Sequence, residues 1–206
     1  IYGFSPPTRG AIKDSKAEEV WTLNNAYRHD VPMERVTRWY DIHSDWYVNS
    51  KLTTDEHRDW LKQEHPFELI TNETFPLDEI IEMLGFRYLT NTIADMAAHA
   101  VLEGVDRLEL YGVDMALGTE YAYQKAGTEF VLGFARGRGV DVYVPDNCAL
   151  LHAPLYAYDQ ESSVASFETV TRHREAYREY FDKLLDRYNE LSNDYERGDT
   201  ELLPII

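Results

Sequence analysis

Residues 90–114 read TNTIADMAAHAVLEGVDRLELYGVD and join a helix to a strand. Thr92 and Asp95 form a pair typical of a helix start, the following residues are rich in alanine, and Gly104 is a typical helix end. Residues 107–114, RLELYGVD, then form a strand with a nearly continuous apolar core, which is typical of a strand buried on both faces. Since alanines let a helix lie close to a strand, the segment predicts a helix packed on a parallel sheet.

The same alternation continues on both sides of this segment. Strands are predicted at residues 1–3, 20–27, 35–43, 67–72 and 140–145. Helices are predicted at residues 14–19, 53–65, 76–84 and 128–139 in addition to 92–103. Strands that alternate with helices favour a parallel sheet covered on both sides. We therefore expect an α/β chain with three layers and a mainly parallel sheet.

The pattern changes after Pro145, and this change divides the chain. We expect residues 1–150 to form the α/β domain and residues 151–206 to form an irregular loop followed by one long helix. That helix is predicted over 167–191, where apolar residues recur at intervals of three and four. Its apolar stripe can pack on its own domain or pair with a partner subunit as a homodimer, and both readings stay open.

Composition limits the partners of the chain. Its 206 residues carry 20 Lys and Arg against 37 Asp and Glu, a net charge of −17. Such a charge repels polyanions, so duplex nucleic acid and an anionic membrane surface are disfavoured. A single cysteine, Cys148, and the absence of any apolar run of about 20 residues favour a cytoplasmic protein.

Polar residues follow each predicted strand at its carboxyl end. These residues are Gly3 and Ser5, Asn24 and Asn25, Asp41 and His43, Asn72, and Gly112 with Asp114. In an open parallel sheet the carboxyl ends share one edge, and ligands bind in the crevice just outside it. We therefore expect these side chains to gather around one ligand.

Each residue type suggests a contact. A glycine turn lets backbone amides approach a phosphate, and a helix start near Thr90 and Asn91 presents free N–H groups. Simple capping of that helix by Thr90 or Thr92 is the alternative, and the two roles are compatible. Asp41, His43 and Asp45 alternate and could project to one side, with His43 as a general base. No metal-binding motif such as HExxH or CxxC is present, so no metal or other cofactor is expected.

The segments GFSP, VWTLNNAY and TNTIADMAAHAVLEGVDRLELYGVDM resemble a Rossmann-like superfamily. It includes bacterial CMP-sialic acid dependent sialyltransferases and 6-hydroxymethylpterin pyrophosphokinase-like proteins, and the chain looks most similar to tailed-phage proteins of this kind. The resemblance covers residues 1–145 and implies a Rossmann-like nucleotide-binding domain. It implies nucleotide contacts at Ser5, Asn24, Thr90, Asn91 and Asp114, to which Gly3 and Asn25 are added from their positions. The sialyltransferases carry a histidine shortly after the GxD strand, and residues 118–129 of this chain have none.

Two main functions follow. The first is a transferase that uses a nucleotide or nucleotide sugar as donor substrate, with catalytic candidates His43, Glu120, Tyr121 and Tyr123. A tyrosine would assist the leaving phosphate, and a carboxylate or His43 would deprotonate the acceptor. The second is a phage protein of the host cytoplasm that binds or sequesters a nucleotide without catalysis. A third reading is an interaction protein that associates through the long helix.

Overall fold

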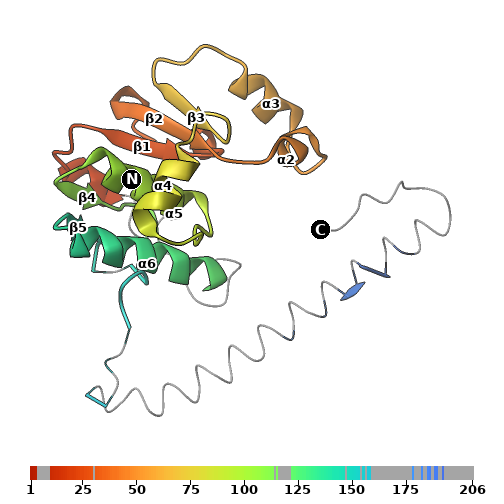
Figure 1. Ribbon diagram of the computed structural model, residues 1–206. Coiled ribbons are helices and arrows are strands. Elements are labelled where there is room, and N and C mark those ends of the chain that lie inside the picture. The colour runs from red at the N-terminus through yellow and green to blue at the C-terminus, as the bar shows by residue number, and fades with distance from the viewer. Residues whose placement is uncertain are drawn as a thin grey trace. The chain divides into compact units, whose positions relative to one another are not determined.

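The computed structural model describes residues 1–3, 10–29, 31–113, 115, 122–146, 148–153, 155, 157–158, 178, 182, 185–186, 188–189 and 192. The chain divides into two compact units, Ile1–Ala153 and Pro154–Ile206. Elements of the first unit, drawn in Figure 1, are η1 (Gly10–Asp14), β1 (Val20–Leu23), η2 (Ala26–Arg28), η3 (Met33–Arg35), β2 (Val36–Asp41), α2 (Asp45–Asn49), α3 (Asp55–Leu61), β3 (Glu68–Thr71), α4 (Leu77–Leu84), α5 (Thr92–Glu103), β4 (Arg107–Glu109), α6 (Ala122–Gly137) and β5 (Asp141–Tyr143).

The strands are all parallel, as the alternating sequence pattern predicts. β1, β2 and β3 form one sheet in that order, and β4 pairs with β5. Residues 1–3 lie between the two groups: the Tyr2 amide donates to the Trp21 carbonyl at 2.8 Å, and the Gly3 amide donates to the Tyr111 carbonyl at 2.7 Å. The first residues of the chain therefore connect the two sets of strands by backbone hydrogen bonds.

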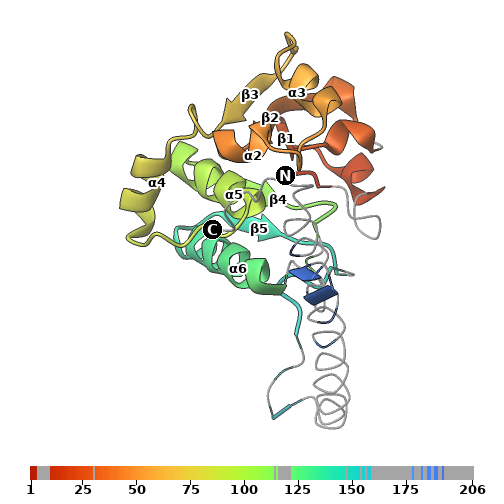
Figure 2. The same cartoon turned by 90° about the vertical axis from the view of Figure 1, so that its right-hand side faces the viewer.

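Both faces of β2 are buried, since its successive residues Trp39 and Tyr40 point to opposite faces and are both fully covered. In β2, Trp39 belongs to one apolar cluster together with Phe67, whereas Tyr40 belongs to a second cluster with Trp21 and helix residues. Helices α4, α5 and α6 contribute to the Tyr40 cluster and lie together in both views (Figures 1 and 2). Helix α3 and η2 supply Trp60 and Ala26 to the Trp39 cluster.

Helix α5 is central to this packing. Its bounds, Thr92–Glu103, and its left-handed Gly104 cap agree with the sequence prediction, and its alanines are fully buried. The expected cap pair was wrong, however. Asn91 is the N-cap and its side chain accepts from the Ala94 amide, because asparagine suits this position better than threonine.

A second local prediction also fails. The helix expected over 14–19 is absent, and the described residues there follow the short η1. The Ser15 hydroxyl donates to the Glu109 carboxylate, and the Ser15 carbonyl accepts from the Arg35 guanidinium at 3.1 Å. These contacts to distant residues hold the segment in an irregular conformation.

The second unit is described at a few helical positions, which are residues 178, 182, 185–186, 188–189 and 192. All except residue 192 lie within 167–191, where the sequence predicts a long helix. Whether its apolar stripe packs on the first unit or on a partner stays a prediction. Within the described part of the chain, no helix combines the length and apolarity needed to span a membrane.

Candidate functional site

The carboxyl ends of the first three strands bring together residues that are far apart in the sequence. In the sheet register Leu23 is paired with Tyr40, and Asp41 is paired with Thr71. Asn24 extends this pairing, since its amide donates to the Tyr40 carbonyl at 2.8 Å. Asn24 and Asp41 therefore lie side by side at one edge of the sheet.

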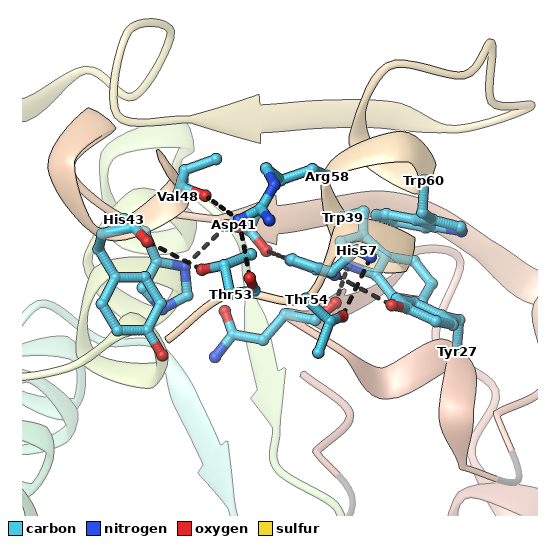
Figure 3. A network of polar contacts seen from close by, with 12 residues as sticks. Tyr27, Trp39, Asp41, His43, Val48, Thr53, Thr54, His57, Arg58 and Trp60 are labelled. Carbon is cyan, nitrogen blue, oxygen red and sulfur yellow. Dashed lines mark hydrogen bonds and ion pairs between the residues drawn. The ribbon is translucent and has the colours of Figure 1, made fainter. Parts of the chain in front are cut away.

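Asp41 is the centre of a polar network at this edge. Its side chain is 1% exposed, and it contacts two imidazoles (Figure 3). Oδ1 lies 2.7 Å from Nδ1 of His43, and Oδ2 lies 2.8 Å from Nε2 of His57. Both carboxylate oxygens are thus used, which offsets the desolvation of a buried polar group.

The outer imidazole, His43, has the geometry of a general base. With Nδ1–H donated to Asp41, Nε2 carries the free electron pair. Among the described residues no hydrogen bond involves this nitrogen, and the His43 side chain is 25% exposed. The ring stacks on Tyr47 at a centroid distance of 4.5 Å, which fixes its plane. An acceptor hydroxyl could therefore reach Nε2 from solvent.

The second imidazole, His57, is positioned by the start of α3. Thr54 is the N-cap of this helix, and its hydroxyl accepts from the His57 amide at 3.3 Å. The side chain of His57 is 12% exposed and also contacts the Tyr27 hydroxyl through Nδ1 at 3.1 Å. This residue lies inside a helix that the sequence predicts, but its contact with Asp41 crosses a loop and was not foreseen.

Arg58 anchors the loop between the two histidines. Its Nη1 atom donates to the carbonyls of Val48, Ser50 and Thr53 at 3.1, 3.0 and 2.7 Å (Figure 3). A guanidinium holds several carbonyls at fixed angles because its donors are coplanar. The segment that follows His43 and leads to His57 is therefore held by one side chain.

Asn24 adds an unsatisfied polar atom beside this network. Its backbone is left-handed, with φ of 48°, and its carbonyl accepts from the Trp39 indole at 2.9 Å. The side-chain Oδ1 is buried and has no hydrogen-bond partner. A buried acceptor without a partner is uncommon, and a bound donor group is one explanation for it. Asn25 follows at the start of η2 without a side-chain cap bond.

Thr90 and Asn91 have a packing role at the start of α5. The Asn91 Nδ2 atom donates to the Gln124 carbonyl and to the Thr128 hydroxyl at 3.1 and 2.9 Å. The Thr90 hydroxyl also donates to the Gln124 carbonyl, at 3.0 Å. These bonds tie α5 to α6. The sequence left capping by Thr90 or Thr92 open, but the cap is Asn91, whose side chain accepts from the Ala94 amide.

Packing explains why a glycine occupies position 3. A Cβ atom at this position would lie 2.5 Å from the carbonyl oxygen of Gly112, so no side chain fits between these strand ends. Gly112 itself has a φ of 67°, a left-handed conformation that glycine adopts without strain.

The other predicted site residues cannot be placed. Ser5, Asp114, Glu120 and Tyr121 lie outside the described residues, as does the side chain of Tyr123. Asp45, the third member of the alternating set, starts α2 and contacts Asn72 at 3.5 Å, away from the Asp41 carboxylate. In the described ranges no three His, Cys, Asp or Glu side chains are arranged to hold a metal ion.

Two further features mark the molecule outside the network. Asp95, in the first turn of α5, is half-buried, and burial raises the pKa of its carboxyl to about 7.

A cavity of about 720 Å³ lies at the opposite, amino end of the strands, where Val20 and Arg107 begin β1 and β4. The residues of the Asp41 network do not line it.

Comparison of the chain with protein-family models, with curated proteins and with solved structures gives no match. The chemistry of the site must therefore be argued from its own geometry.

Proposed function

We propose that the chain is a transferase with a three-layer, Rossmann-like domain that binds a nucleotide or nucleotide sugar at the carboxyl ends of its strands. The observation that carries this proposal is the 2.7 Å contact between Asp41 and His43 at the sheet edge, with Nε2 of the imidazole directed away from the carboxylate. Open parallel sheets bind ligands at this edge. A histidine held by a buried carboxylate is a frequent general base.

The chemical step follows from this arrangement. Nε2 of His43 takes the proton of the acceptor hydroxyl as its oxygen forms a bond to the transferred glycosyl or phosphoryl group. The bond to the donor's leaving phosphate breaks, and that phosphate leaves with the bonding electron pair. Asp41 stabilises the imidazolium formed, because its carboxylate already accepts from Nδ1. The network then changes from one net negative charge to neutral.

The donor is proposed to bind beside this base. Asn24 supports the assignment, since its unpartnered Oδ1 can accept from an N–H or O–H group of a nucleotide. Residues 1–3 pair with both sets of strands, and the crevice where strand order reverses is the usual ligand position. Gly3, Ser5, Asn25, Thr90, Asn91 and Asp114 complete the proposed nucleotide contacts, and Glu120, Tyr121 and Tyr123 the proposed catalytic group.

The alternative function is nucleotide binding without transfer. The absence of a histidine from residues 118–129, where the sialyltransferases carry one, favours it. Mass spectrometry separates the two functions: after long incubation with an acceptor mixture, a transferase consumes its donor and a sequestering protein returns it unchanged.

Isothermal titration with CMP, UDP, GDP and ATP, with and without magnesium, tests binding. We expect at least one nucleotide to bind to the wild type and to bind more weakly to Asn24→Ala. Asn49→Ala is the matched control, because Asn49 ends α2, is exposed and is not among the proposed contacts. No binding of any nucleotide at millimolar concentration would remove both functions.

A further inference from the structure

Beyond His57, the network contains a tyrosine that the sequence analysis did not single out. The Tyr27 hydroxyl lies 3.1 Å from Nδ1 of His57, and the planes of the two rings differ by 12°. Their centroids are 5.8 Å apart, and the two rings are stacked. The hydroxyl and Nδ1 are within hydrogen-bond distance of each other.

The protons of the network can be assigned from these contacts. Burial raises the pKa of the Tyr27 phenol, so its hydroxyl is protonated at neutral pH and can donate. If Tyr27 donates to Nδ1 of His57, the single ring proton of a neutral His57 sits on Nε2 and points at Asp41. Asp41 then receives one N–H from each imidazole and stays ionised.

The opposite tautomer of His57 breaks this arrangement. With its proton on Nδ1, His57 would turn a lone pair toward Oδ2 of Asp41 at 2.8 Å. Two acceptors at that distance repel each other unless Asp41 takes up a proton. A protonated Asp41 could no longer stabilise a positive charge on His43, so the second imidazole controls the first through their shared carboxylate.

Besides Asp41, whose Oδ2 faces Nε2 at 2.8 Å, few groups around His57 act on its tautomer. Asp41, Arg28 and Glu56 are the charged groups that act on Tyr27, and Arg28 and Glu56 form an ion pair with each other. Trp60 stacks on Tyr27 at 4.8 Å and lies against His57 without donating to it. The Tyr27 hydroxyl is the one hydrogen-bond partner of Nδ1 of His57 among the described residues.

We propose that Tyr27 is a positioning residue that holds His57 in its Nε2–H tautomer and thereby keeps the Asp41 carboxylate available to His43. The tautomer itself does not depend on the transferase activity. Only its consequence for the rate rests on the proposed function.

The test is an ¹⁵N-histidine NMR spectrum of the full chain without ligand. In the wild type we expect His57 to show a protonated Nε2 and an unprotonated Nδ1. In Tyr27→Phe, which keeps the ring and removes the hydroxyl, we expect loss of this single tautomer and a mixture of forms. His57→Gln identifies the His57 signals by their absence, and Tyr88→Phe, outside the network, should leave them unchanged.

Two results would overturn the proposal: a wild-type His57 that carries its proton on Nδ1, or a Tyr27→Phe spectrum with the same single tautomer as the wild type. The wild-type spectrum decides even if the variant folds poorly.

Activity provides a second readout. If transfer is found, Tyr27→Phe should lower kcat by about tenfold with KM unchanged. In a His57→Gln background the same change should have no effect, since glutamine has no tautomer to control. An equal loss in both backgrounds would contradict the proposal. If no transfer is found, only the proposed function fails, and the NMR result still stands.

Discussion

Asp41 and His57 are 16 residues apart in the sequence and are joined at 2.8 Å between Oδ2 and Nε2, across a loop that Arg58 holds. This contact places a second imidazole on a carboxylate that already holds His43. Because the Asp41 side chain is almost fully buried, its two oxygens depend on these two donors. Asp41 is therefore the residue that links His43 to His57.

Replacing Asp41 by Asn should lower both the stability of the protein and the rate of any transfer reaction. The amide offers one acceptor and one donor, so one imidazole must change its tautomer to face the new N–H group. We expect a loss in the free energy of unfolding of about 1–3 kcal/mol in urea titrations. Any transfer rate should fall by roughly 10²-fold or more, as expected for a base in the wrong tautomer. An unchanged rate would show that Asp41 does not orient His43.

Asn91 should be important for folding whatever it does with a ligand. Asn91→Ala removes the cap bond to the Ala94 amide and the bonds to Gln124 and Thr128. We expect the free energy of unfolding to fall by about 2–3 kcal/mol. Asn49→Ala, which loses one exposed bond to a carbonyl, is the control and should change it by less than about 1 kcal/mol. Similar values for both variants would contradict the packing role.

Two glycines of α6 should respond in opposite ways to alanine. A Cβ at Gly127 would lie 2.1 Å from the Thr90 hydroxyl oxygen, whereas nothing lies within 4 Å of a Cβ at Gly133. Gly127→Ala should therefore destabilise the protein by about 1–3 kcal/mol. Gly133→Ala should stabilise it by about 0.5–1 kcal/mol, the helix propensity gain. Chemical denaturation of both variants checks the sign, and equal effects would contradict the close α5–α6 contact.

Asp95 should make stability depend on pH near neutrality. Burial raises the pKa of its folded-state carboxyl to about 7. Between the ordinary aspartate value and this value the folded state holds a proton that the unfolded state has released, so stability falls as pH rises through this window. Asp95→Asn removes the titration. The free energy of unfolding of Asp95→Asn relative to that of the wild type should increase by on the order of 2 kcal/mol from about pH 5 to about pH 8.5.

Urea titrations at several pH values measure this difference directly. Asp59→Asn, at an exposed position of α3, serves as the control and should show a gain that does not change with pH. A constant gain for Asp95→Asn would contradict the raised pKa.

Much of the fold could be predicted because its signals are local. Thr54 before α3 and Gly85 and Gly104 after α4 and α5 mark helix ends by side-chain and backbone chemistry that acts within one turn. The strands around Trp39 and Ile70 are rich in β-branched and aromatic residues, which are typical of strands. The helix predicted over 14–19 does not form, because Ser15 bonds to Glu109, a distant residue that no local pattern reveals.

The site was predicted only in part, for the same reason. Asp41 and His43 are close in sequence, and their alternation indicated a shared side that the 2.7 Å contact confirms. His57 and Tyr27 reach the same carboxylate only after the loop and η2 fold around it, so no spacing marks them. Asn91 is proposed as a nucleotide contact, and its hydrogen bonds to α6 give it a packing role that no spacing marks.

The most direct test of the central claim compares His43→Gln with the wild type in binding and in turnover. For the nucleotide that titration identifies, donor consumption is followed by mass spectrometry at saturating donor with an acceptor mixture. The account predicts equal donor affinity and a rate lower by about 10²-fold or more in the variant, because only the base is removed. Turnover at the wild-type rate in His43→Gln would contradict it.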